Sequence, residues 1–174
     1  MPEPVVRRLT AVSEGQIAQL ADVLIDCVAG SAPVTFMHPL SSAKAQAFWR
    51  QVAEDVAADE RALLVAEDAS GIAGTVQLIF APFENQPHRA DLAKMLVHRR
   101  ARRRGIGAAL MRGAEQVAAE CGRTLLVLDT ATGSDAERLY ARLGWQRAGV
   151  IPGYSLMPQE GMCDTTYFYR RLGG

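Results

Sequence analysis

The residues best suited to chemistry stand at positions 102–108, where an apolar run breaks into an arginine-rich turn. Arg102, Gly105 and Gly107 have the spacing Arg-x-x-Gly-x-Gly, between a predicted strand over 89–97 and a predicted helix from about Ile106. Glycine admits positive φ and close approach of the backbone to a ligand. The first N–H groups of a helix and its positive dipole end attract anions. The sequence therefore predicts a phosphate-binding turn, to which the neighbouring arginines add charge.

A basic surface for nucleic acid is the alternative interpretation of this turn, because five arginines stand at 99, 100 and 102–104. The whole chain has 19 basic and 19 acidic residues and a net charge of +0, so it has no general positive field. The turn also lacks the third glycine of a dinucleotide site and the Gly-Lys-Ser/Thr ending of a triphosphate loop. The charge is local, which favours a small anion over nucleic acid.

Length and composition predict a single domain spanning 1–174. The first residues have neither a basic region nor an apolar core, and no run approaches the ~18 apolar residues of a membrane span. We therefore expect a cytoplasmic protein with no membrane partner. Cys27, Cys121 and Cys163 are odd in number and have no ligand spacing with the three histidines, so we expect buried thiols, no disulfide framework and no metal site.

Hydrophobic periodicity predicts a mixed α/β order of elements. The helix that follows the arginine turn joins two strands that we expect to be parallel, and the second of them is expected to be buried on both faces. Ser134 and Glu137 predict a capping box. The predicted strands are 5–9, 62–67, 72–80, 89–97, 124–128, 146–151 and 165–171, and the predicted helical faces are 17–28, 45–56, 106–121 and 136–143.

This order and two motifs resemble the GNAT superfamily of N-acetyltransferases. Arg102-x-x-Gly105-x-Gly107 matches the family's Gln/Arg-x-x-Gly-x-Gly/Ala at all three fixed positions. The segment 139–145, Leu-Tyr-Ala-Arg-Leu-Gly-Trp, resembles the second signature, aromatic-Tyr-x-x-x-Gly-Phe. The resemblance implies an α/β (α+β) GNAT fold, with a mostly antiparallel sheet splayed between strands 4 and 5 and about four flanking helices.

The resemblance also implies acetyl-CoA as the acetyl donor, wedged into the splay. Its pantetheine arm would pair with the backbone of 95–97, and N–H groups near Met95 and Leu96 would polarise the thioester carbonyl. The residues expected to bind the cofactor are Met95, Leu96, Val97, Arg102, Arg103, Arg104, Gly105, Ile106, Gly107 and Ala108.

Three residues are expected to carry the chemistry. The resemblance places the Tyr140 hydroxyl near the thioester sulfur, where it can protonate the departing thiolate. Asp91 and Asp129 would attract a cationic amine and accept its proton, Asp91 through a bridging water because its side chain is shorter than the Glu of many relatives. The plain alternatives are a core tyrosine, a solvent-facing strand aspartate and a turn aspartate.

The acceptor is expected to be the primary amine of a small polar molecule, attacked directly in a ternary complex. Several segments resemble family members that inactivate amino-acid-like toxins, among them 89–97, 128–130 and 151–154. Residues 151–154 and 157–161 are expected to form a lid beside the acetyl group, with Tyr154 as an aromatic wall of the acceptor site. The alternatives are acetylation of protein lysines or N-termini, a non-catalytic acetyl-CoA-binding module and a nucleic-acid module; a homodimer is left open.

Overall fold

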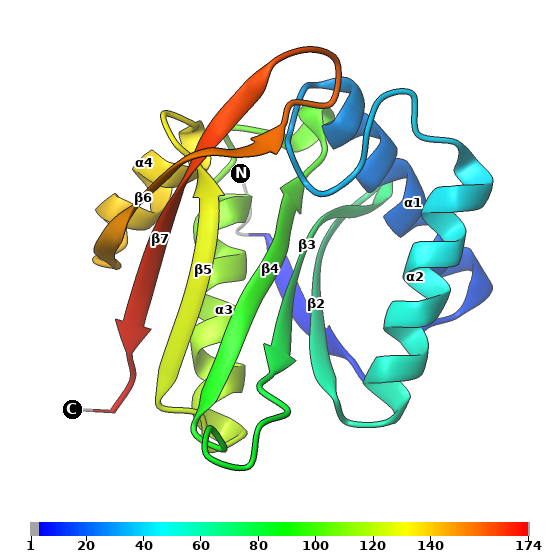
Figure 1. Ribbon diagram of the computed structural model, residues 1–174. Coiled ribbons are helices and arrows are strands. Elements are labelled where there is room, and N and C mark those ends of the chain that lie inside the picture. The colour runs from blue at the N-terminus through cyan, green and yellow to red at the C-terminus, as the bar shows by residue number, and fades with distance from the viewer. Residues whose placement is uncertain (1–3, 174) are drawn as a thin grey trace.

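A computed structural model describes residues 4–173, which form a seven-stranded sheet in the order β1-β2-β3-β4-β5-β7-β6 (Figure 1). Neighbouring strands are antiparallel except β4 and β5, which are parallel. The strands are β1 Val5–Leu9, β2 Arg61–Asp68, β3 Gly71–Phe80, β4 Arg89–Val97, β5 Leu125–Ala131, β6 Gln146–Leu156 and β7 Met162–Arg171.

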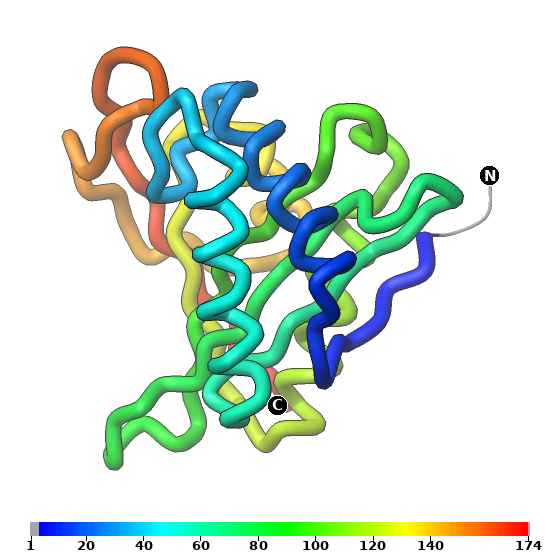
Figure 2. Tube along the Cα trace, turned by 90° about the vertical axis from the view of Figure 1, so that its right-hand side faces the viewer, coloured from blue at the N-terminus to red at the C-terminus, as the bar shows by residue number. Residues whose placement is uncertain are grey.

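Two helices cover each face of the sheet (Figures 1 and 2). α1 and α2 pack side by side over β1–β4 and bury a core that contains Trp49 and Leu24. α3 and α4 lie on the opposite face, where Leu110 and Tyr140 join a second core. The helices are α1 Glu14–Ala29, α2 Ser42–Ala57, α3 Ile106–Glu120 and α4 Asp135–Arg142, with a 3₁₀ turn, η1, at Arg99–Ala101.

The parallel pair holds together over a short stretch only. Three residue pairs join β4 to β5, and the last of them is Asp91 with Val127. Beyond that pair the strands diverge, so the edge of β4 that faces β5 has no strand partner from Leu92 onward (Figure 1). The expected splay between strands 4 and 5 is thus confirmed.

A β-bulge in β4 lies just beyond the point of divergence. Ala93 pairs with Gln77 and Leu96 with Thr75, so β4 holds one residue more than β3 over this interval, and Lys94 takes a positive φ of 51°. A bulge of this kind exchanges the two faces of a strand. Leu92 accordingly packs in the α3 core, whereas Leu96 packs in the α1/α2 core.

The predicted fold class and order of elements are confirmed, with three local corrections. β5 is not buried on both faces: Leu126 and Leu128 are buried, but Asp129 is exposed because no helix of the described chain covers that face beside the splay. The last two strands are longer than predicted, and residues 151–154, which were expected to form part of a lid, belong to β6. These strands form one long hairpin whose outer strand is almost wholly exposed.

The capping box before α4 forms only in part. The Ser134 hydroxyl accepts a hydrogen bond from the Glu137 N–H at 3.1 Å, as predicted. The Glu137 carboxylate, however, accepts from the Gly133 N–H, because the Ser134 N–H already donates to the Ala131 carbonyl at 3.2 Å. The Glu137 carboxylate therefore binds the backbone of Gly133, one residue before the N-cap Ser134, instead of the N-cap backbone itself. This bond holds the start of α4, the helix that carries Tyr140.

Candidate active site

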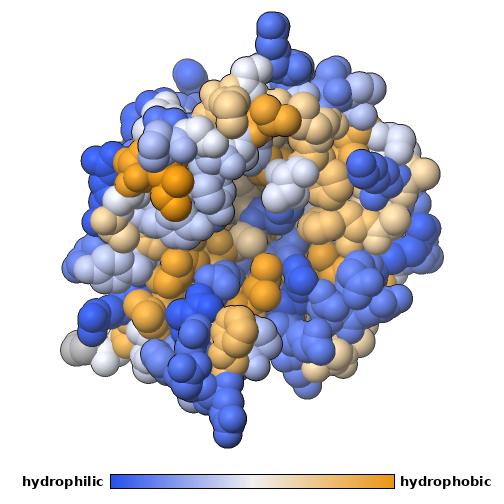
Figure 3. Space-filling view, in the orientation of Figure 1, coloured by the Kyte–Doolittle hydropathy of each residue, from blue (hydrophilic) through white to orange (hydrophobic). Residues whose placement is uncertain are grey.

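A cleft of about 950 Å³ opens where β4 and β5 diverge. The face of the molecule seen in Figure 3 is hollowed near its centre, between flanks on which hydrophobic residues gather. The cleft is lined by residues from the loop after α1, from β4, from the start of α3, from β5, from α4 and from the β6–β7 hairpin. Its lining includes Met95, Leu96, Val97, Arg102, Arg103, Gly105, Ile106, Gly107, Ala108, Asp129 and Tyr140.

The start of α3 leaves unpaired N–H groups in this cleft. Gly105 is the N-cap residue, with a left-handed φ of 74°, and it makes no side-chain capping bond. The first intrahelical bond runs from the Ala109 N–H to the Gly105 carbonyl, at 3.0 Å. The N–H groups of residues 106–108 therefore have no acceptor within the helix, as is normal for a first turn. This is the donor set that a phosphate group requires.

Gly107 lines the cleft, as its motif suggests, and it also has a packing role. A Cβ at this position would lie 3.0 Å from Leu139 Cδ2 and 3.7 Å from Met95 Sδ. Glycine thus lets the first turn of α3 pack closely against α4 and β4. Gly105 therefore supplies the left-handed turn, and Gly107 allows the close packing of the elements that form the cleft.

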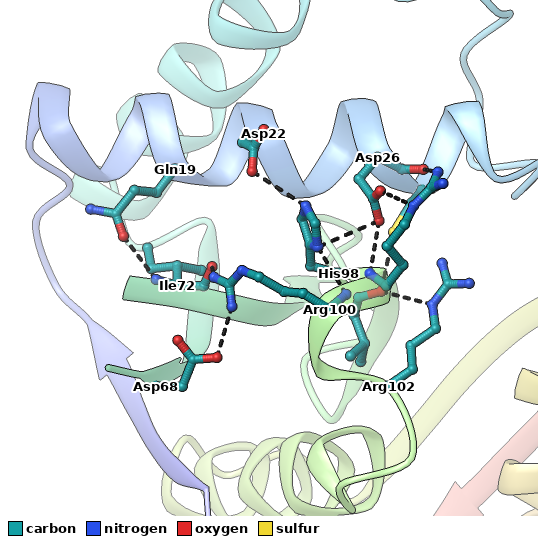
Figure 4. Close-up of polar contacts among 11 residues, drawn as sticks. Gln19, Asp22, Asp26, Asp68, Ile72, His98, Arg100 and Arg102 are labelled. Carbon is teal, nitrogen blue, oxygen red and sulfur yellow. Dashed lines mark hydrogen bonds and ion pairs between the residues drawn. The ribbon is translucent and has the colours of Figure 1, made fainter. Parts of the chain in front are cut away.

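The first two arginines of the run hold the turn to the rest of the fold, and Figure 4 shows Arg100 with its partners Asp68 and Ile72. Arg99 pairs with Asp26 of α1, whose carboxylate also accepts from the Arg99 backbone N–H at 2.9 Å. Arg100 donates to Asp68 at 2.7 Å and to the Ile72 carbonyl at 2.9 Å. Both cations are therefore used in structural ion pairs, and the run is not a continuous basic surface.

The remaining arginines divide between the cleft and its rim. Arg102 and Arg103 line the cleft, and the Arg102 Nε donates to the Val97 carbonyl at 3.2 Å. Arg104 is absent from the cleft lining found among residues 4–173, and its guanidinium lies 4.0 Å from Asp68. Two of the three predicted arginines thus line the cleft.

Tyr140 lies where its hydroxyl can act as an acid. Its side chain is only 5% exposed, it packs with Trp145 and Phe168, and it lines the cleft. Burial, with a smaller contribution from the Asp129 carboxylate, raises the pKa of the Tyr140 hydroxyl well above its ordinary value. The hydroxyl therefore keeps its proton at neutral pH. Within residues 4–173 it makes no hydrogen bond, so the proton is free for a ligand.

The two predicted aspartates share a face of the sheet but differ in position. Asp129 lines the cleft, and the Thr165 hydroxyl holds its carboxylate with a 2.8 Å hydrogen bond. Asp91 stands opposite Val127, below the point of divergence, and forms a 2.5 Å ion pair with Arg89. Asp91 is not part of the cleft lining found in the described chain. The geometry therefore favours Asp129 for direct contact with a bound amine.

Tyr154 does not line the cleft among the described residues; it lies in β6 and is 47% exposed. Its hydroxyl lies 3.0 Å from the Tyr167 hydroxyl, and the two rings are nearly perpendicular. In the register of β5 and β7, Tyr167 stands opposite Asp129. Tyr154 is thus connected to Asp129 only through Tyr167, which is also absent from the cleft lining among the described residues. The sequence motifs did not identify Tyr167, although it alternates with Thr165 along the last strand. From the predicted lid, Met157 does line the cleft.

Lys94 is a second residue that the sequence analysis did not single out. It lines the cleft at the β4 bulge, and its ammonium lies 5.7 Å from the centre of the Phe48 ring. Burial lowers the pKa of Lys94, and the nearby Asp129 carboxylate partly opposes that effect. A charged residue inside the apolar run 92–97 was the signal in the sequence that could have identified it.

Comparison with known proteins decides the family. Residues 30–145, more than half of the chain, match the acetyltransferase (GNAT) family. The chain belongs to this family. The protein is accordingly an acetyl-CoA-dependent N-acetyltransferase, and the donor expected from the sequence is confirmed.

Solved structures share the fold over almost the whole chain. A ribosomal-protein-alanine N-acetyltransferase from Brucella melitensis has a TM-score of 0.80 at 22% identity, covering 97% of this chain and 99% of its own. The yncA protein of Salmonella typhimurium, solved with its cofactor acetyl-CoA, has a TM-score of 0.79 at 16% identity, covering 99% and 96%. A protein described as a phosphinothricin N-acetyltransferase has a TM-score of 0.79 at 17% identity, covering 98% and 100%.

The residues of the cleft fit a bound acetyl-CoA. The free N–H groups at the start of α3 suit a pyrophosphate, and the open edge of β4 offers backbone groups to the amide-containing pantetheine arm. Among residues 4–173 no helix is long and apolar enough to cross a membrane.

Proposed function

We propose that the protein transfers the acetyl group of acetyl-CoA to the primary amine of a small, polar, amino-acid-like molecule by direct attack in a ternary complex. The observation that carries this proposal is that a buried, protonated hydroxyl, Tyr140, and an oriented carboxylate, Asp129, line one cleft. They supply the acid and the base that an amine acetylation needs.

On the donor side, the cofactor supplies an activated acetyl thioester, and the chain holds it in place. The first turn of α3, with Arg102 and Arg103, binds the pyrophosphate, and Arg104 adds charge at the rim. The backbone of 95–97 aligns the pantetheine arm, and its N–H groups near Met95 and Leu96 stabilise the negative charge that develops on the carbonyl oxygen.

On the acceptor side, the amine must lose a proton before it attacks, since an alkylamine has a pKa of about 10. Asp129 attracts the cation and accepts the proton, directly or through a water. Asp91 lies on the same face one step further from the cleft, so it acts through a bridging water. Tyr140 then donates its proton to the departing thiolate.

Direct attack is favoured over a cysteine-linked route by the state of the two thiols in the cleft. Burial raises the pKa of the Cys27 thiol, and Arg102 opposes this only in part. Cys163 lies 3.2 Å from the Ser155 hydroxyl, which is not a base that could activate it. A nucleophilic cysteine needs a lowered pKa or an adjacent base.

Two observations favour a small acceptor. The long β6–β7 hairpin contributes Met157 and Cys163 to one wall of the cleft, which narrows the approach from that side. The sequence segments noted above also resemble the tabtoxin resistance protein, which acetylates an amino-acid-like toxin, and one structural neighbour is described as a phosphinothricin N-acetyltransferase. Another neighbour is named for the alanine of a ribosomal protein, so protein acetylation is the second candidate.

The test is release of CoA thiol in the presence of a panel of amines. We expect turnover with one or more amino acids, amino-acid-like antibiotics or polyamines, and little with folded proteins or peptides. Efficient acetylation of a protein or peptide, without activity on any small amine, would promote the second candidate. A Tyr140→Phe variant in the same assay separates enzymatic release from background thiol.

A further inference from the structure

Lys94 presents a positive charge to the cleft from the bulge in β4. The chain has only two lysines, Lys44 and Lys94, among its 19 basic residues, and Lys94 is the one that lines the cleft. The bulge sets its direction. Met95 and Val97 pack against the core on the α3 side, where the cofactor turn lies, whereas the Lys94 ammonium lies over Phe48 of α2 on the opposite side. Lys94 therefore faces the acceptor side of the sheet.

The Lys94 ammonium has no counter-ion among the described residues. Within residues 4–173, no carboxylate oxygen lies within the 4.0 Å of an ion pair with its Nζ, whereas the nearby Arg61 is paired with Asp55 at 2.7 Å. A partly desolvated and unpaired cation is costly unless a ligand supplies the missing negative charge. Burial lowers the pKa of Lys94, and the Arg61 cation adds to this effect.

Asp129 lies across the splay from Lys94, on β5, and is close enough for its charge to affect the lysine. The two strands thus present opposite charges on the two sides of the cleft. An acceptor with both an ammonium and an anionic group can meet both charges at once, but a simple amine meets only the aspartate. We propose that Lys94 binds an anionic oxygen group of the acceptor, a carboxylate or phosphinate, and so selects zwitterionic amines. This proposal rests on the proposed function.

The experiment compares each amino acid with the amine obtained by removing its carboxylate: methionine with 3-methylthiopropylamine, and lysine with cadaverine. Phosphinothricin is added as a zwitterion that also carries a phosphinate. The variants are Lys94→Met, which keeps a long side chain at the bulge, Lys94→Arg, which keeps the charge, and Lys44→Met, which removes an exposed lysine from α2. Binding to the CoA-bound enzyme is measured by titration calorimetry, and turnover by thiol release.

We expect the wild type to bind at least one zwitterion more tightly than its decarboxylated partner. Lys94→Met should weaken zwitterion binding by about 10-fold to about 100-fold, the usual effect of losing a charge-assisted hydrogen bond. It should change binding of the simple amine by less than about 2-fold and raise KM rather than lower kcat. Lys94→Arg should keep most of the preference and Lys44→Met all of it.

The two proposals fail in different ways. Lys94-dependent binding of a zwitterion without acetyl transfer would overturn the proposed function but support the role of Lys94. Turnover of small amines with no preference for a carboxylate, or an equal loss for both partners in Lys94→Met, would overturn the role of Lys94 alone. Binding of no zwitterion by the wild type would also overturn it.

Discussion

Replacement of Tyr140 by Phe tests the chemistry most directly, because it removes one oxygen atom and leaves the packing unchanged. The ring, which packs between Trp145 and Phe168, is retained. Because no described group hydrogen-bonds to the hydroxyl, its loss leaves no orphaned partner, and the free energy of unfolding should change by less than about 1 kcal/mol. Without its acid the enzyme should lose about 10²-fold to about 10⁴-fold in kcat, or roughly 3 to 5 kcal/mol of transition-state stabilisation.

The assay for this variant combines turnover, cofactor binding and a pH profile. Acetyl-CoA should still raise the melting temperature of Tyr140→Phe as it does for the wild type, because the hydroxyl is not required for phosphate binding. Since burial raises the pKa of Tyr140, the acid stays protonated, and therefore active, up to and beyond the ordinary tyrosine value of about 10. The wild-type rate should show no alkaline loss due to this group below that pH.

Tyr169→Phe is a matched control, since Tyr169 lies in β7 and does not belong to the cleft lining found in the described chain. It should keep wild-type kcat. Wild-type turnover in a well-folded Tyr140→Phe variant would reduce Tyr140 to a packing residue. An alkaline loss of rate near pH ~8 that disappears in this variant would refute the reasoning about its pKa.

Three further predictions concern the donor turn and the acceptor side. Acetyl-CoA at a hundredfold excess over Kd should stabilise the wild type by about 2.7 kcal/mol. Gly107→Asp should abolish this stabilisation, because the Cβ of the new side chain meets Leu139 and its negative charge repels phosphate. A full thermal shift in this variant would contradict the assignment of the turn. Asp129→Asn should raise the amine KM and lower kcat while the Kd of acetyl-CoA, measured by titration, stays within about 2-fold; unchanged amine kinetics would remove Asp129 from the mechanism. Tyr154→Ala should weaken small acceptors only modestly, because Tyr154 is connected to Asp129 only through its 3.0 Å hydrogen bond to Tyr167; a KM increase above about 10-fold would show direct contact.

The donor half of the site could be predicted from the sequence because it is local. Residues 102–108 form one turn and the start of one helix, so their spacing alone places the free N–H groups. The apolar periodicities of α1, α2 and α3 could also be recognised in the sequence, since each helix buries one face against the sheet. The packing role of Gly107 could not be predicted in this way, because its contact Leu139 lies 32 positions away in the sequence.

The acceptor half could be predicted only in part because it depends on register. Asp129 was recognised as the end of a strand, but its partner Tyr167 depends on the pairing of β5 with β7, which the sequence alone does not set. Residues 151–154 were expected to form part of a lid, and they contain Pro152 and Gly153. In the structure β6 is an edge strand with bulges at Arg147/Gly149 and Ile151/Ser155, where such residues are tolerated.

The bulge at Lys94 connects these two halves. A regular β4 would send alternate side chains to alternate faces along its whole length, and Leu92 and Leu96 would then lie on the same face. With one extra residue, Leu92 packs under α3 and Leu96 under α1, while Lys94 is held at a positive φ between them. The same irregularity lies just where β4 loses its partner β5. The extra residue of the β4 bulge thus coincides with the opening of the cleft. It places Met95 beside the donor turn, and it directs Lys94, the only lysine in the cleft lining of the described chain, to the acceptor side. Deleting one residue at 93–94 should therefore remove acetyl-CoA binding and acceptor selection together, whereas Lys94→Met should affect selection alone.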